Sequence, residues 1–251
     1  FSGLGMQSKA DLERILAIGA PEGRSRVLGN LKYDIPFSPV AGDERRHLRQ
    51  LYRIPADLAV FCIGSTHPGE EEQLLAVYQE LLRQFDHLLL VLVPRHPERT
   101  AEVEALVSNL GLPVVRRSAL EQFSSGCHAG MVLLVDTVGE LMKLYALSDL
   151  AYVGGSLVPT GGHNLLEPAS RGIPILFGPH MDNFQEITTL ALEYGAGVQV
   201  ADQQELLDAA ADFLATPELR QVVGSNGLKL LRDSGGAVER HLTMLKEVLQ
   251  Q

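Results

Sequence analysis

Between residues 58 and 200, short apolar runs alternate with amphipathic helical patterns, and this alternation limits the folds open to the chain. The apolar runs are strand-sized and lie at 58–63, 88–93, 131–135, 150–153 and 173–177. Strands without a polar face are typical of parallel sheets that helices cover on both faces. The segment 70–85 repeats leucine, valine and aromatic residues at helical spacing. The sequence therefore predicts an α/β fold, a doubly wound parallel sheet of the Rossmann-like kind.

The 251 residues are expected to divide near residue 35. Residues 1–35 carry one helical pattern and a strand-like run at 27–29, but too few apolar residues for a core of their own. A connector with several prolines and the arginines Arg45, Arg46 and Arg49 follows and enters a helix. We therefore assign residues 1–35 to a tail and interdomain segment, and residues 36–251 to the main Rossmann-like domain.

The stretch YVGGSLVPTGGHNLLEP at 152–168 predicts an anion site. It reads as a strand, a first glycine pair, a loop ending in the pair Gly161–Gly162, and a helix that begins at His163 or Asn164. The first turn of a helix leaves backbone N–H groups unpaired and carries the positive end of the macrodipole. No acid precedes Glu167, which is placed to reach a sugar hydroxyl. The alternative is that the glycines only turn the chain.

Polar residues also follow other predicted strands. Ser65 and Thr66 offer hydroxyls, although the three glutamates that begin the next helix would repel a phosphate. Pro94 precedes Arg95, whose guanidinium can bind a carboxylate or phosphate through two hydrogen bonds. The turn 138–140 starts a helix and is a weak signal alone, because polar helix caps are common. The carboxyl ends of parallel strands meet at one edge of a sheet, so these groups are expected to share a crevice.

The composition excludes several classes of function. The formal charge of −10 argues against nucleic-acid partners, apart from a possible local patch at Arg95, His96 and Arg99. No apolar run is long enough to span a bilayer. Cys62 and Cys127 lack a metal or redox spacing, and no DxD or HExxH motif predicts a metal site. The glycine pairs match neither the dinucleotide-binding pattern nor the phosphate-binding loop of nucleoside triphosphatases.

Together, the motifs GNLKYD, GSTHPGEEE, PRHPER, DTVGELMKLY, YVGGSLVPTGGHNLLEPA and FGPHMDNFQEI resemble the carboxyl-terminal half of bacterial 3-deoxy-D-manno-octulosonic acid (Kdo) transferases. The resemblance runs from about Met6 to Leu249, and the GGHNLLEPA block carries most of its specificity. These enzymes are GT-B glycosyltransferases with two Rossmann-like domains, and they move Kdo from CMP-Kdo to the lipid A precursor. The resemblance implies that residues 36–251 bind CMP-Kdo and that residues 1–35 end the amino-terminal domain.

The resemblance also implies residue roles. Lys32 matches a basic residue expected to stabilise the transition state. Including the hydroxyls and glycines above, the expected donor-binding residues are Ser65, Thr66, Pro94, Arg95, Val138, Gly139, Glu140, Gly161, Gly162, His163, Asn164, Leu165, Leu166 and Glu167. No metal and no cofactor beyond the donor CMP-Kdo is expected. The acceptor cleft, the general base and the membrane anchor are expected in the amino-terminal domain, so this chain alone is expected to be soluble and inactive. The full-length protein is expected at the cytoplasmic face of the inner membrane.

Two other functions stay open at the level of sequence. The same fold serves glycosyltransferases that use a UDP-sugar, although a diphosphate would require more hydrogen-bond donors than one helix start offers. The chain is also compatible with a nucleotide-binding module that catalyses nothing itself. Comparing the affinities for CMP and UDP distinguishes a UDP-sugar enzyme from a Kdo transferase. An activity assay with and without a partner domain tests whether the chain is a non-catalytic module.

Overall fold

The computed structural model describes residues 1–250 of the chain, which form two compact units. The larger unit is Ser38–Leu228, and the smaller unit combines Phe1–Phe37 with Lys229–Gln251. The division expected after residue 35 lies beside the one at Phe37. The last helix, which we expected in the main domain, is grouped with the amino-terminal segment instead. Within the described residues, no helix combines the length and the apolar composition needed to cross a bilayer.

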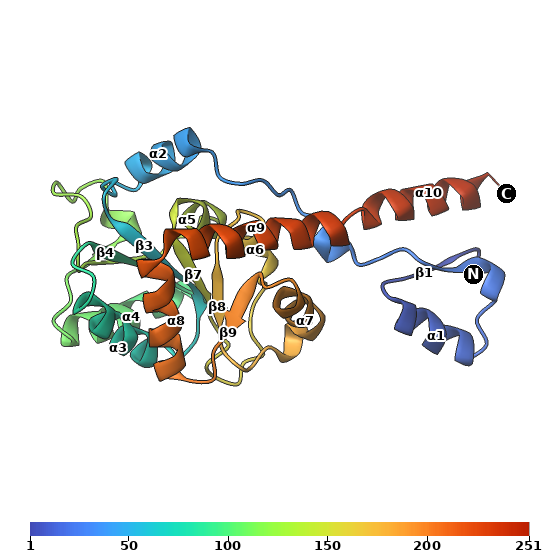
Figure 1. Cartoon of the computed structure of the whole chain (residues 1–251), viewed down its shortest axis with the longest axis horizontal. Helices are drawn as coiled ribbons and strands as arrows, with labels where there is room; N and C mark the ends of the chain where they lie inside the picture. Colours follow the sequence, from blue (N-terminus) through green and yellow to red (C-terminus); the bar gives the residue numbers. More distant parts are fainter. Residues whose placement is uncertain (251) are drawn as a thin grey trace. The chain divides into compact units, whose positions relative to one another are not determined.

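The larger unit is built on a seven-stranded parallel sheet with the strand order β5-β6-β4-β3-β7-β8-β9 (Figure 1). The strands are β3 (Ala59–Thr66), β4 (Leu88–Pro94), β5 (Val114–Arg116), β6 (Val132–Leu134), β7 (Leu150–Val153), β8 (Ile175–Phe177) and β9 (Gly197–Gln199). The chain places β4 on one side of β3 and later returns to place β7 on the other side. The strand order therefore reverses between β3 and β7, which is where such sheets bind ligands at their carboxyl ends.

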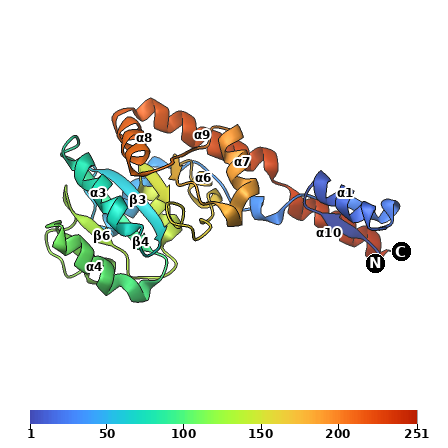
Figure 2. The same cartoon turned by 90° about the horizontal axis from the view of Figure 1, so that it is seen from below.

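Helices cover both faces of this sheet, and Figure 2 shows α3 and α4 lying over β3 and β4. The helices are α2 (Gly42–Leu51), α3 (Glu71–Leu82), α4 (Thr100–Asn109), α5 (Leu141–Leu147), α6 (Leu166–Ala169), α7 (Gln185–Glu193), α8 (Gln203–Ala215) and α9 (Pro217–Ser234). Alternate residues of β3 enter different cores: Phe61 and Ile63 pack with α3 and α8, whereas Val60 and Cys62 pack with α2 and α5. The predicted doubly wound parallel α/β fold is confirmed.

The smaller unit contains a two-stranded parallel sheet of β1 (Leu4–Met6) and β2 (Ser25–Val27), with α1 (Lys9–Ala17) between them in the chain. The strand expected at 27–29 is found as β2, which begins and ends two residues earlier than expected. After the short 3-10 helix η2 (Leu31–Tyr33), the Asp34 carboxylate accepts hydrogen bonds from N–H groups at the start of α10 (Ala237–Leu249). These bonds join the amino-terminal segment to the last helix.

Candidate donor-nucleotide site

The loops after β3, β4 and β7 meet where the strand order reverses. The Arg95 N–H donates to the Thr66 carbonyl at 3.0 Å, which joins the loop after β4 to the end of β3. β3 ends in a bulge at Ser65, whose φ of 61° is a left-handed conformation that is rare for serine. A Cβ on Gly154, at the end of β7, would lie 2.6 Å from the Ser65 carbonyl oxygen. Only glycine allows this close approach of the two loops.

The first glycine pair forms an anion site that the chain fills with its own Glu70. The Glu70 carboxylate accepts N–H groups from Gly155 at 2.7 Å, Ser156 at 3.1 Å and Leu157 at 3.0 Å. The Tyr152 hydroxyl also donates to Glu70, at 3.1 Å. Glu70 is fully buried, and Gly155 supplies the positive φ of 67° that turns its N–H toward the carboxylate. The loop after β3 is therefore fastened to the loop after β7, and this group of N–H donors is occupied.

The second glycine pair leads into a loop rather than a helix. The helix that we expected to begin at His163 or Asn164 begins instead at Leu166, so this boundary was wrong. The physical reason is that the Asn164 side-chain oxygen accepts the Leu166 N–H at 3.1 Å, which closes a turn and keeps residues 163–165 in the loop. No acceptor among the described residues meets the N–H groups of His163, Asn164 and Leu165. These three donors remain available to an anion.

Three histidines gather beside these N–H groups. The His67 and His163 rings stack, with centroids 5.1 Å apart and planes at 14°, and their Nε2 atoms are 2.8 Å apart. His96 meets His67 edge to face at 5.8 Å. At a separation of 2.8 Å one Nε2 carries a hydrogen atom and donates a hydrogen bond to the other Nε2. The pair joins the loop after β3 to the loop after β7 a second time.

The histidine pair is held neutral. Burial, followed by the positive charges around it, lowers the pKa of His163 from 6.5 to about 4. Burial is also the main reason that the pKa of His67 is lowered, with Glu70 acting in the opposite direction. Arg95 is one of the charges that lower the pKa of His163. A bound anion would offset these positive charges.

Glu167 lies near enough to Arg95 for the two charges to interact. Burial raises the pKa of Glu167, and Arg95 opposes that rise. No hydrogen bond or ion pair to the Glu167 carboxylate is formed within residues 1–250. The Arg95 side chain is exposed and has no ion-pair partner in the same part of the chain. The site thus holds an unpaired cation, three open N–H donors and a half-buried carboxylate.

Other predicted site residues are engaged inside the protein. The Thr66 hydroxyl is fully buried and donates to Glu71 at 2.9 Å. Glu71, which is also buried, forms an ion pair of 2.7 Å with Arg99. Arg99 is therefore neutralised, and it does not extend a basic patch with Arg95 and His96. Pro94 is the buried last residue of β4 and fixes the direction in which the next residue leaves the strand.

The turn 138–140 after β6 exposes its backbone, whereas the carboxylate of Glu140 is engaged within the protein. Val138 is 84% exposed, and Gly139 has a φ of 84°. The Glu140 carboxylate accepts hydrogen bonds from Tyr52 at 3.1 Å and from Thr137, and it forms an ion pair of 3.4 Å with Arg117. Because the Glu140 oxygens already have protein partners, the turn offers a ligand mainly its backbone groups and the Val138 side chain.

Lys32 belongs to the smaller unit, where it is the central residue of η2. Its backbone N–H donates to the Asn30 side chain at 3.0 Å. The role expected of its ammonium group stays a prediction. Elsewhere, no group of three or more His, Cys, Asp or Glu side chains in the described residues is arranged to hold a metal ion.

We expect the acid stability of the protein to depend on His163. Its pKa is about 4 in the folded protein and 6.5 in the unfolded chain, so the unfolded chain takes up a proton first as the pH falls. Stability should therefore fall between pH 6.5 and 4, and His163→Asn should flatten this fall. Urea unfolding at pH 7.5 and pH 5 measures the difference, with the exposed His47→Asn as control. Equal pH dependence in all three proteins would contradict the assignment.

Comparison with known proteins identifies relatives of this chain. No protein-family model matches the chain. A 3-deoxy-D-manno-octulosonic acid transferase of Haemophilus influenzae is 36% identical over 240 residues, which are 95% of this chain and 55% of that protein. The crystal structure of the C-terminal CMP-Kdo binding domain of WaaA from Acinetobacter baumannii matches with a TM-score of 0.68 and 37% identity, covering 75% of this chain and 96% of that domain. Anabaena Alr3699/HepE in complex with UDP-glucose matches with a TM-score of 0.60 and 15% identity, covering all of this chain and 64% of that one, and shares the fold.

Proposed function

This chain belongs to the family of bacterial Kdo transferases, and from that premise we propose that its larger unit binds CMP-Kdo for transfer of Kdo to the lipid A precursor. The chain spans about half the length of the Haemophilus relative. The complete reaction is therefore proposed for the full-length protein, which we place at the cytoplasmic face of the inner membrane. This chain supplies the donor half of the reaction.

We propose that the donor phosphate lies over the open N–H groups of His163, Asn164 and Leu165, with the Arg95 guanidinium on its other side. Backbone N–H groups and a guanidinium both favour a phosphate oxygen. Glu167 accepts a hydrogen bond from a ribose hydroxyl, since its carboxylate has no partner among residues 1–250. The Val138–Gly139 backbone is the proposed contact for the base or ribose.

The proposed reaction inverts the anomeric carbon and uses no metal. An acceptor hydroxyl oxygen attacks that carbon, the bond from the carbon to the phosphate oxygen breaks, and CMP leaves with the bonding electron pair. The hydroxyl proton passes to a base, which we place in the half of the full-length relatives that this chain does not span. Arg95 and the N–H groups stabilise the negative charge that grows on the leaving phosphate. Lys32 is the proposed second source of positive charge.

One observation carries this proposal: unpaired N–H donors, an unpaired arginine and an unpaired carboxylate lie together at the point where the strand order reverses. Calorimetry with CMP and UDP tests it. The site offers one group of open N–H donors, because the group beside Gly155 is occupied by Glu70. One group suits the single phosphate of CMP better than the diphosphate of UDP, so we expect CMP to bind more tightly. Preference for UDP would instead favour a UDP-sugar enzyme, and binding of neither would remove the proposed site.

Glu167→Ala should weaken CMP binding by about 1 to 3 kcal/mol, the range for loss of a hydrogen bond to a charged group. Glu167→Gln, which keeps an acceptor oxygen, should weaken it less. Glu193→Ala removes an exposed acid at the end of α7 and serves as the control for net charge. Isothermal titration of the four proteins measures the effect. If Glu167→Ala bound CMP as the parent chain does, the ribose would have to lie elsewhere.

A further inference from the structure

A second group of positive charges lies at the opposite edge of the sheet. It borders Asp149, which directly precedes β7, and Ala59, which begins β3. Two cavities of about 380 and 360 Å³ meet here, and both are lined by Arg45, Asp149 and Arg220. This edge carries the amino ends of the strands, whereas the donor site lies at their carboxyl ends. We call this place the arginine cleft.

Five arginines line the arginine cleft, against two aspartates. The arginines are Arg45, Arg46, Arg49, Arg171 and Arg220, and the aspartates are Asp57 and Asp149. An excess of positive charge in one cleft is unexpected in a chain whose formal charge is −10. Arg171 forms an ion pair with Glu44, beside the cleft, and the two aspartates do not neutralise the other four arginines.

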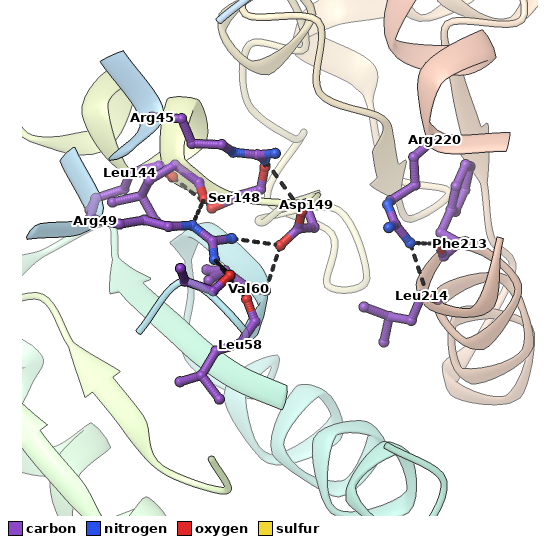
Figure 3. A network of polar contacts seen from close by, with 12 residues as sticks. Arg45, Arg49, Leu58, Val60, Leu144, Ser148, Asp149, Phe213, Leu214 and Arg220 are labelled. Atoms are coloured by element: carbon purple, nitrogen blue, oxygen red, sulfur yellow. Dashed lines mark hydrogen bonds and ion pairs between the residues drawn. The ribbon is translucent and has the colours of Figure 1, made fainter. Parts of the chain in front are cut away.

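Arg49 has a structural role in this group (Figure 3). Its guanidinium donates to the carbonyl of Leu58 at 2.8 Å, to the carbonyl of Leu147 at 3.3 Å and to the Asp149 carboxylate at 2.9 Å. Asp149 also accepts the Val60 N–H at 2.9 Å. These bonds hold α2 to the start of β3 and β7, and they occupy most donors of Arg49.

Arg45 and Arg220 are less well compensated. Arg45 forms a 3.4 Å ion pair with Asp149, which also pairs with Arg49, and it donates to the Ser148 carbonyl. Its buried Nε has no hydrogen-bond partner in the described chain. Burial lowers the pKa of Arg45, Asp149 opposes this, and the like charges of Arg49 and Arg220 add to it. The Arg220 guanidinium donates to the carbonyls of Phe213 and Leu214, and no carboxylate among residues 1–250 forms an ion pair with it. Figure 3 shows Arg220 bonded to Phe213 and Leu214, apart from Arg45 and Asp149.

We propose that the arginine cleft binds a ligand through a phosphate group. Guanidinium groups bind phosphate oxygens through paired hydrogen bonds, and a dianion between Arg45 and Arg220 would offset their mutual repulsion. The cavity volumes suit a small phosphorylated molecule or a phospholipid headgroup. The cleft is separate from the donor site, so its occupation does not depend on the function proposed above.

Isothermal titration with pyrophosphate tests the proposal. The titration is done with Arg95→Gln as the parent protein, which weakens anion binding at the donor site, and the dependence on the cleft arginines then identifies binding at the cleft. Arg46 is exposed, and Arg46→Gln removes charge without disturbing the bonds of Arg49. Together with Arg220→Gln it should weaken pyrophosphate binding at least tenfold. Arg83→Gln removes an exposed arginine that pairs with Glu80 and does not line the cleft, so it should leave binding unchanged. Thermal unfolding verifies that each variant is folded.

Sedimentation with lipid vesicles separates the two sources of phosphate. Phosphatidylglycerol vesicles that bind the Arg95→Gln protein, and release it when Arg46 and Arg220 are replaced, would identify a headgroup. Binding of pyrophosphate with the same dependence on the two arginines, but no binding to vesicles, would identify a free phosphorylated molecule. Phosphatidylcholine vesicles serve as the control. The proposal is overturned if neither probe binds, or if binding is the same with and without the two arginines.

Discussion

Glu70→Ala should lower the free energy of unfolding by roughly 3 to 5 kcal/mol, because a buried donor left without an acceptor costs about 1 to 3 kcal/mol and three donors lose theirs. Glu70 is fully buried and accepts the N–H groups of Gly155, Ser156 and Leu157. Alanine would leave these three donors without an acceptor, and each buried unpaired group is costly. Urea unfolding at pH 7.5 measures the loss.

The same substitution should also abolish CMP binding. The Gly155 carbonyl accepts the Gly162 N–H at 2.8 Å, so a displaced first glycine pair would displace the second pair and the open N–H groups after it. Glu70→Gln, which keeps the shape and one acceptor oxygen, should recover part of the stability. Glu72→Ala, which removes an exposed acid of the same run, should change the unfolding free energy by no more than about 0.5 kcal/mol. A Glu70→Ala protein as stable as Glu72→Ala would show that Glu70 does not hold the loops.

The repeating part of the fold could be predicted because hydrophobic periodicity is a local property. The expected strand at 150–153 is found as β7 with the same bounds, and the helical pattern at 70–85 contains α3. β4 is buried along its whole length, as its uniformly apolar sequence predicted. The start of α6 was missed because it depends on one side-chain bond, from Asn164 to the Leu166 N–H, which periodicity cannot reveal.

The candidate site could be predicted only in part. Parallel topology places the residues after β3, β4 and β7 at one edge, and the effect of Arg95 on the pKa of both His163 and Glu167 agrees with that placement. The site itself stays a prediction. The pairing of His67 with His163 joins residues far apart in the sequence, and no short motif announces it.

The run Glu70–Glu72 shows why sequence reasoning misjudged the acids. Acids at the start of a helix usually face solvent and favour its dipole, so the sequence predicts that all three repel a phosphate. In the fold, Glu70 fills the N–H groups beside Gly155 and Glu71 pairs with Arg99, so only Glu72 is exposed. The signal available was the neighbouring glycine pair. The proposed donor has one phosphate, so two groups of N–H donors in one loop region leave one group for a carboxylate of the chain.

Arg49→Met should be the second most destabilising of the substitutions considered, at roughly 3 to 5 kcal/mol, because it leaves a mostly buried carboxylate without its better partner. The side chains of Arg49 and Asp149 are 10% and 16% exposed, and their atoms meet at 2.9 Å. Methionine retains the apolar stem but removes the donors to Asp149 and to the carbonyls of Leu58 and Leu147. Urea unfolding measures the loss. Arg83→Met, at a surface ion pair with Glu80, should cost at most about 1 kcal/mol.

The double variant separates the two causes of this loss. Asp149→Asn removes the charge but keeps an acceptor for the Val60 N–H, which Asp149 accepts at 2.9 Å. If an unpaired carboxylate is the main cost, Asp149→Asn should be destabilising alone but should restore part of the stability of Arg49→Met. The part that it does not restore belongs to the carbonyls that have lost their donor. Strict additivity of the two substitutions would show that Arg45, 3.4 Å from Asp149, already compensates the carboxylate, and that Arg49 acts only through the backbone of the strand starts.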